Sequence, residues 1–256
     1  MPALLTFDDY VDALTAAGRR LAAAGLEAGL DSPVPPCPGW DVRALVAHQA
    51  MVHRWATAHV SGEDPSAVPE ETALRERPDL LDHYREGLDR LVAALRAAPV
   101  DLEALRFLRD APPARLFWAR RQAHETTIHC VDAEAARLGR LPTAADVTIG
   151  PALAEDGIDE LVRGFFTRGR SKLELPAPTT LLIDPDDVAR RWLARIGPGF
   201  SVDPDGAELP SGGADVTMTG GSVDIYLALW NRGDGVTCSD DGRLLGLWRE
   251  AQRVQW

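Results

Sequence analysis

A chain of 256 residues is long enough to bury one large hydrophobic core or two smaller ones. Its formal net charge of −12 argues against a surface that binds nucleic acid or an anionic membrane. No apolar run approaches a membrane span, and the first residues carry no basic segment typical of a secretion signal, so we expect a cytoplasmic protein without a membrane partner. The three widely spaced cysteines indicate reduced thiols rather than a disulfide framework.

The first predicted helix begins after Thr6 and ends near Gly25. Thr6 is a suitable N-cap, and Asp9 occupies the position that a capping box gives to an acidic residue. Apolar residues then recur at helical spacing, namely Tyr10, Leu14, Ala17, Leu21 and Ala24. A proline-rich loop is expected over residues 31–38.

The second predicted helix runs from Asp41 to about Val60 and carries two histidines on different sides. His48 shares the apolar face with Leu45, Val52, Trp55 and His59, so we expect it to point into the core. His53 lies roughly 140° away around the helix. A core histidine is either a metal ligand or a donor to a backbone carbonyl, and the helix alone does not decide between them.

The chain between residues 61 and 113 is expected to hold a polar loop, a third helix and a connection. The loop covers 61–78 and the helix about 79–98, with Leu81, Tyr84, Leu88, Leu91 and Leu95 as its apolar side. His83 is expected to face solvent. Residues 101–113 are expected to connect this helix to the next, with a short helical turn.

The fourth predicted helix follows Pro113, contains no glycine or proline, and ends near Gly139. Glu125 and His129 are four residues apart and therefore share one helical face, with Asp132 one turn further along. Four helices of this length, joined by loops, favour a four-helix bundle.

In such a bundle His48 of the second helix can meet Glu125 and His129 of the fourth. Two imidazoles and one carboxylate form a catalytic zinc set that leaves one coordination position open. The alternative is a hydrogen-bonded Glu/His pair inside the core. The pattern is not the zincin motif, because His124 and His129 are five residues apart.

The pattern changes after a predicted linker at 144–151. We expect a helix over 155–166, strands at 179–184, 188–196, 213–219 and 236–239, and helices over 222–232 and 243–249. This order indicates an α+β fold class with a small antiparallel sheet. The predicted domains are 1–143 and 152–256.

Five segments of the chain carry a resemblance to a known family, namely Pro38–His48, Arg121–Glu134, Asp156–Glu160, Gly213–Val216 and Leu229–Arg232. They are similar to motifs of the mycothiol-dependent maleylpyruvate isomerase family, which is part of the DinB-like superfamily. The resemblance implies an N-terminal DinB-like four-helix bundle and a C-terminal sterol-carrier-like α+β domain. It also implies a divalent metal, usually zinc, on His48, Glu125 and His129, with mycothiol as the thiol cofactor and an actinobacterial source.

The chemistry expected from this resemblance is thiol activation. A cation at the three ligands favours the thiolate of a bound thiol, which attacks an electrophilic small molecule. In the isomerase the thiol adds to a cis-enoyl acid, the bond rotates and the thiol leaves. In a transferase relative the thiol stays on the product. We expect a monomer or a homodimer.

Four further residues are candidates for the site. His53 is a candidate proton shuttle, and Arg232 is a candidate donor to a substrate carboxylate. Asp132 and His124 are candidate contacts for the cofactor. The alternatives are that His53 and His124 support ligands or pack in the core, that Asp132 orients His129, and that Arg232 only caps a helix.

One residue departs from the family pattern. Cys130 stands where the family often has arginine after the second ligand of the fourth helix. It is either a thiol near the metal or a buried inert cysteine. Two alternatives to an enzyme stay open. The protein is then either a module that binds metal or a small ligand without turnover, or a bundle in which all three candidate ligands serve only as core hydrogen-bonding groups.

Overall fold

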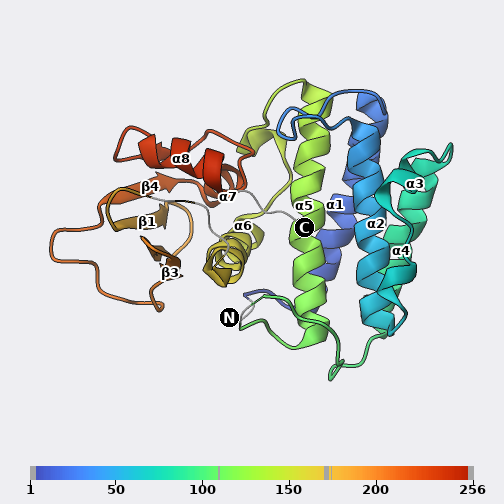
Figure 1. Ribbon diagram of the computed structural model, residues 1–256, viewed down its shortest axis with the longest axis horizontal. Coiled ribbons are helices and arrows are strands. Elements are labelled where there is room, and N and C mark those ends of the chain that lie inside the picture. The colour runs from blue at the N-terminus through green and yellow to red at the C-terminus, as the bar shows by residue number, and fades with distance from the viewer. Residues whose placement is uncertain (1–3, 109, 170–172, 174, 253–256) are drawn as a thin grey trace. The chain divides into compact units, whose positions relative to one another are not determined.

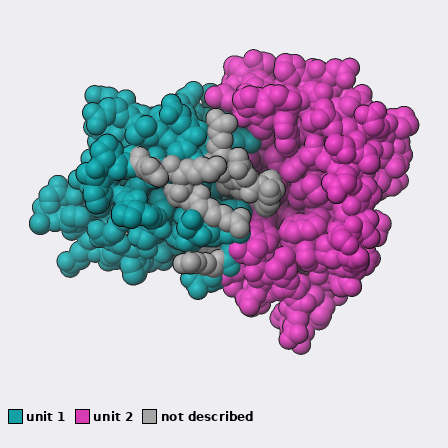
Figure 2. All heavy atoms as spheres, viewed as in Figure 1, with its two compact units in different colours: residues 1, 108–110, 143–256 teal, residues 2–107, 111–142 magenta. Residues whose placement is uncertain are grey.

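The computed structural model describes residues 4–108, 110–169, 173 and 175–252. The chain forms two compact units, which Figure 2 colours separately. The helical unit comprises residues 2–107 and 111–142, and the sheet unit comprises residues 143–256 together with 1 and 108–110. A helical N-terminal region followed by a five-stranded sheet with helices confirms the predicted α+β fold class.

The helical unit is built from long helices that pack in pairs (Figure 1). The long helices are α1 (Phe7–Ala28), α2 (Val42–Ser61), α4 (Leu80–Ala97) and α5 (Ala114–Leu138). Helix α1 packs on α5 and α4, and α2 packs on α4 and α5, which is the arrangement of a four-helix bundle. None of the helices in the described part of the chain is both long and apolar enough to cross a membrane.

Local signals explain where the helices begin and end. The Thr6 side chain accepts a hydrogen bond from the backbone N–H of Asp9, and the Asp9 carboxylate accepts one from Thr6, which completes the predicted capping box. Asp41 caps α2 by accepting a 2.7 Å hydrogen bond from Ala44. Gly139 ends α5 in the left-handed conformation, at φ 68°.

Two loop predictions in this unit are wrong. Residues 61–78 are not simply a loop, because they contain a 3-10 turn (Pro65–Ala67) and the short helix α3 (Glu71–Arg75). No helical turn is present among the described residues of 101–113, a range in which residue 109 is not described. Helix α3 packs on α2 and is too short to be stable alone, so its formation depends on this tertiary contact.

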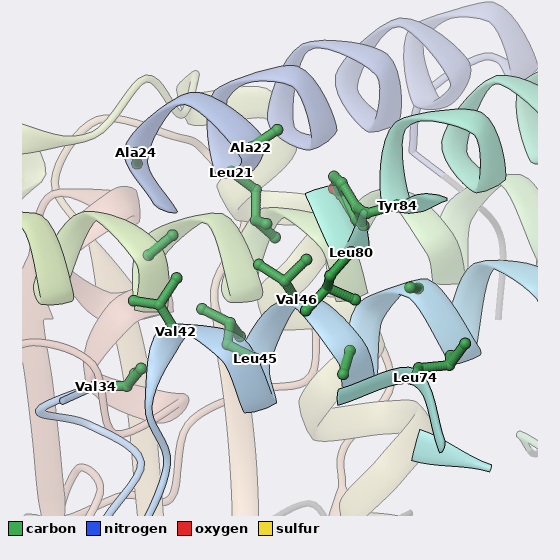
Figure 3. Packing of buried hydrophobic residues seen from close by; sticks show 13 residues of the cluster. Leu21, Ala22, Ala24, Val34, Val42, Leu45, Val46, Leu74, Leu80 and Tyr84 are labelled. Atoms are coloured by element: carbon green, nitrogen blue, oxygen red, sulfur yellow. The ribbon is translucent and has the colours of Figure 1, made fainter. Parts of the chain in front are cut away.

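One apolar cluster of the helical unit joins α1, α2, α3, α4 and α5 (Figure 3). It includes Leu21, Leu45, Val46, Leu74, Leu80 and Tyr84, all of which are buried. Leu74 belongs to α3, so the short helix is anchored in the same core as the long ones. This anchoring fixes the position of α3 on α2.

The sheet unit begins with a helical segment and continues into strands. The segment comprises a 3-10 turn (Ala144–Asp146), α6 (Pro151–Asp159), a π-helix (Glu160–Phe165) and a 3-10 turn (Phe166–Arg168). The strands are β1 (Thr179–Pro185), β2 (Trp192–Ile196), β3 (Phe200–Val202), β4 (Val216–Gly220) and β5 (Thr237–Cys238). The remaining helices are α7 (Ser222–Leu229) and α8 (Arg243–Ala251).

The sheet has the order β3-β2-β1-β4-β5 and is mixed rather than antiparallel. Strand β4 pairs with β1 in parallel, with Leu181 opposite Val216, whereas the other neighbours are antiparallel. The prediction of an antiparallel sheet is wrong because the residues between β1 and β4 include β2 and β3 and form a crossover. The strand predicted over 188–196 begins only at Trp192, and the helix predicted from 155 begins at Pro151.

Candidate metal centre

Three buried side chains of the helical unit converge on one point. His48 comes from α2, and Glu125 and His129 come from α5. One donor atom from each lies within 4.8 Å of the other two. The Nε2 atoms of His48 and His129 are 3.7 Å and 3.2 Å from Oε1 of Glu125. We call these three residues the donor cluster.

The donor cluster contains polar atoms that the protein leaves without hydrogen bonds. Nε2 of His48 and Oε1 of Glu125 are both buried and make no hydrogen bond of good geometry, although Nε2 of His129 lies 3.2 Å from that oxygen. Such atoms cost free energy unless another group compensates them. A divalent cation among two imidazole nitrogens and one carboxylate oxygen supplies that compensation, so the residues present fit a metal ion.

The other nitrogen of each imidazole faces a carboxylate. Nδ1 of His129 lies 2.9 Å from Oδ2 of Asp132, one turn along the same helix. Nδ1 of His48 lies 3.3 Å from Oε2 of Glu71, which belongs to α3. A carboxylate at Nδ1 holds the proton there and directs the Nε2 lone pair toward the cation position.

Two further side chains complete the surroundings. Arg121, one turn before Glu125, donates a 3.2 Å hydrogen bond to the Oε2 atom of that carboxylate, and both side chains are almost fully buried. The Trp40 ring stacks on His129 at an interplanar angle of 14° and lies 5.1 Å, centroid to centroid, from His48. Glu125 therefore has one oxygen engaged by Arg121 and one directed at the histidines.

The carboxylates determine the charge of the cluster without metal. Burial alone lowers the pKa of His48, but Glu125 and Glu71 outweigh it and raise that pKa to about 9. Burial likewise opposes the charged form of His129, yet Asp132 and Glu125 raise its pKa. Burial raises the pKa of Glu125, but the two histidines and Arg121 hold it below its usual value. A cation entering this cluster must displace imidazole protons.

The candidate proton shuttle His53 lies in a different environment. Its Nε2 atom is 2.9 Å from both the Gln49 amide nitrogen and the Thr126 hydroxyl oxygen. Its ring stacks on Tyr84, with centroids 5.3 Å apart. Burial lowers the pKa of His53 to about 3, so the ring is neutral near pH 7. Its catalytic role stays a prediction.

The two candidate cofactor contacts are both fully buried. Asp132 faces His129, and its Oδ2 atom also accepts a 3.5 Å hydrogen bond from the Cys37 thiol. The His124 ring lies 6.3 Å, centroid to centroid, from the Tyr10 ring at an interplanar angle of 69°. The structure thus places Asp132 where it orients His129, and contact of either residue with a cofactor stays a prediction.

Arg232 belongs to the sheet unit, just after α7. Its guanidinium donates a 2.8 Å hydrogen bond to the carbonyl oxygen of Trp230, and the residue is half-buried. This contact satisfies a carbonyl at the end of α7. Its proposed contact with a substrate carboxylate stays a prediction.

Cys130 follows His129 on α5 but is not activated. Burial raises the pKa of its thiol to about 12, and Glu134 adds to the shift. The thiol packs against the apolar cluster of the helical unit. Cys130 is only partly buried overall, and this environment supports the interpretation of an inert cysteine.

Sequence reasoning missed three residues that surround the donor cluster. Arg121 had a usable signal, because it stands four residues before Glu125 on the same helix. Trp40 had a weaker one, since it lies directly before the N-cap of α2. Glu71 had none, because it lies in a polar segment whose helical conformation depends on packing.

Comparisons with known proteins agree with this architecture. The family described as mycothiol maleylpyruvate isomerase N-terminal domain matches residues 11–134, and the MDMPI C-terminal domain matches residues 152–247. A crystal structure of the mycothiol-dependent maleylpyruvate isomerase shares the fold, at 19% sequence identity and a TM-score of 0.66, over 94% of this chain and 97% of that chain. The structure of a histidine-to-alanine mutant of the mycothiol-dependent maleylpyruvate isomerase has the same TM-score and coverage, at 18% identity. No curated protein matches the chain.

Proposed function

Because the chain belongs to the mycothiol-dependent maleylpyruvate isomerase family, we propose that it is a metal- and mycothiol-dependent enzyme acting on an electrophilic small molecule. The reaction we propose is the cis–trans isomerisation of an unsaturated acid of the maleylpyruvate type. The observation that carries the proposal is the donor cluster, in which three buried donor atoms lie within 4.8 Å of one another. In a purely structural hydrogen-bond network, Nε2 of His48 and Oε1 of Glu125 would make hydrogen bonds of good geometry, whereas here both atoms are buried without one.

His48, Glu125 and His129 would hold the metal, which we propose to be zinc or another divalent ion. A cation on this ligand set supplies a Lewis acid with an open position and favours the thiolate form of a thiol. The chain's own residues prepare the ligands. Glu71 and Asp132 accept the Nδ1 protons of the two histidines, which leaves both Nε2 atoms free to bind.

Arg121 and Trp40 support the same role. Arg121 pairs with one oxygen of Glu125, adds to the two histidines in keeping that buried carboxylate ionised, and leaves the other oxygen for the metal. The Trp40 ring covers His129 and lies beside His48, which restricts water around the ligands. Restricted water strengthens the electrostatic interactions within the site.

Metal analysis tests the ligand set. Native protein should bind about one equivalent of zinc, the one-site stoichiometry of a three-ligand centre, and His48→Ala should lose it. His83→Ala is a matched control, because His83 is a half-buried histidine of α4 that does not belong to the donor cluster and whose backbone carbonyl accepts a hydrogen bond from Arg54. Equal zinc content in native protein and His48→Ala would remove the metal claim.

Turnover assays test the cofactor and the reaction class. With maleylpyruvate as substrate, activity should require added mycothiol, and the product should keep the substrate's mass. A product heavier by one thiol would instead establish thiol transfer. Tight metal or ligand binding without turnover across a set of cis-enoyl acids would favour a binding module and sink the enzymatic proposal.

A further inference from the structure

Helix α3 presents three contacts to α2 from one side. Glu71, Leu74 and Arg75 stand at positions i, i+3 and i+4, which share one face even in a helix of a single turn. Glu71 faces Nδ1 of His48, and the guanidinium of Arg75 lies 3.6 Å from the carboxylate of Asp41. Leu74 is buried in the apolar cluster that Figure 3 shows.

The partners of α3 on α2 have a matching spacing. Asp41, Leu45 and His48 stand at i, i+4 and i+7, which is also one helical face. Leu45 is in the same apolar cluster as Leu74. Glu71 pairs with the later residue His48 and Arg75 with the earlier residue Asp41, so the two faces meet in antiparallel register. Figure 1 shows α3 beside α2. Two polar pairs, Glu71 with His48 and Arg75 with Asp41, therefore hold α3 on α2, and buried Leu74 anchors α3 in the apolar cluster.

The two carboxylates that face the imidazoles come from different kinds of segment, one from the same helix as its histidine and one from another helix. Asp132 is fully buried and is carried by the helix that carries His129, so its placement follows from the geometry of α5. The Glu71 side chain is 29% exposed and comes from a separate segment, 23 residues from His48. Its placement depends on whether α3 is docked.

We propose that Glu71 is a positioning residue and that docking of α3 is coupled to occupation of the metal site. When α3 is docked, Glu71 holds the Nδ1 proton of His48 and directs Nε2 into the donor cluster. By thermodynamic linkage, a cation bound at His48 then stabilises the docked form of α3. This inference rests on the metal site of the proposed function.

The test measures zinc affinity, by competition with a chromophoric chelator, in native protein, Glu71→Ala and Glu71→Gln. Glu71→Ala should weaken zinc binding by about 10- to 100-fold, the usual cost of removing such a support from a metal ligand. Glu71→Gln should fall between the two, because its amide oxygen still accepts the Nδ1 proton without a charge. Glu70→Ala is the matched control, an exposed neighbouring glutamate whose loss should leave the affinity unchanged.

Hydrogen exchange of residues 70–77, with and without zinc, separates positioning from simple folding. Zinc should slow exchange in this segment in native protein and Glu70→Ala but not in Glu71→Ala. If Glu71→Ala does not fold, Glu71→Gln decides, and it should show weaker zinc binding and a reduced zinc effect on exchange. Native zinc affinity in both Glu71 variants would overturn this inference and keep the metal site. Native protein that binds no zinc would overturn both.

Discussion

Two neighbouring layers of the helical unit shift the pKa values of their imidazoles in opposite directions. One layer is the donor cluster, and the other is formed by His53, Gln49 and Thr126. In the donor cluster, His48 and His129 face carboxylates, and their pKa values are raised. In the adjacent layer, His53 faces an amide and a hydroxyl, and burial lowers its pKa to about 3. All three rings are buried, so burial does not separate them.

The two layers are one residue apart on each helix. Gln49 follows His48 on α2, and Thr126 follows Glu125 on α5. One residue is a rotation of about 100° around a helix, so the same two helices present charged donors on one side and neutral hydrogen-bonding groups on the next. The charge of the partner, rather than depth in the core, decides whether an imidazole can exchange a proton for a metal ion.

The largest expected effect comes from neutralising the shared carboxylate. Glu125→Gln should weaken zinc binding by more than about 100-fold, because it changes a ligand and not only its support. Thr126→Val removes a hydroxyl of the neighbouring layer and should retain zinc binding. Isothermal titration of both variants measures the contrast. If Glu125→Gln and Thr126→Val lost comparable zinc affinity, the two layers would not differ in their electrostatic character.

Arg121→Met should give the next largest effect, on stability. Arg121→Met leaves the Oε2 atom of the buried Glu125 without its cationic hydrogen-bond donor, and we expect a loss of about 3–5 kcal/mol in the unfolding free energy of the metal-free protein. Urea denaturation with a chelator present measures it. The loss should be smaller with zinc bound, because the cation compensates Glu125. A loss that is independent of zinc would show that Arg121 does not act through this carboxylate.

The metal-free protein should show opposite pH dependences from its two layers. The folded-state pKa of His48 is raised from 6.5 to about 9, so its contribution to stability is complete below pH 6.5 and is lost as the pH rises through 9. The folded-state pKa of His53 is lowered to about 3, so its contribution is present above pH 6.5 and is lost as the pH falls toward 3.

Urea denaturation from pH 4 to pH 9.5 measures these slopes. His48→Gln should flatten the alkaline side of the profile, and His53→Gln should flatten the acidic side. Zinc affinity should rise with pH up to about 9, because the cation displaces the proton of His48. Alkaline slopes that are equal in native protein and His48→Gln would contradict the assignment.

The smallest effect is expected at Cys130. This residue adjoins His129, but burial keeps its thiol protonated, with a pKa of about 12. Cys130→Ala should therefore leave zinc affinity unchanged, and Cys130 of the native protein should react slowly with iodoacetamide at pH 7. Rapid alkylation at this cysteine would show that the charges of the donor cluster lower the pKa of the Cys130 thiol enough to outweigh its burial.

Most of the helical unit could be predicted from local signals. The capping pair Thr6 and Asp9, the cap Asp41 and the terminal Gly139 place helix ends within a few residues of those observed. The sheet unit was less predictable. Strand β3 has only three residues, and the parallel pairing of β1 with β4 depends on the path of the intervening chain, for which no local signal exists.

The spacing of Glu125, His129 and Asp132 was set by the sequence itself. A helix of about 3.6 residues per turn fixes where side chains four and three residues apart must stand, whatever surrounds them. The periodicity of α2 likewise set the inward direction of His48. Only the tertiary structure decided that His48 meets the other two and that Glu71 stands behind it. That outcome depends on the packing of α2 against α5 and on a one-turn helix that is stable only when docked, and neither is encoded within a single segment.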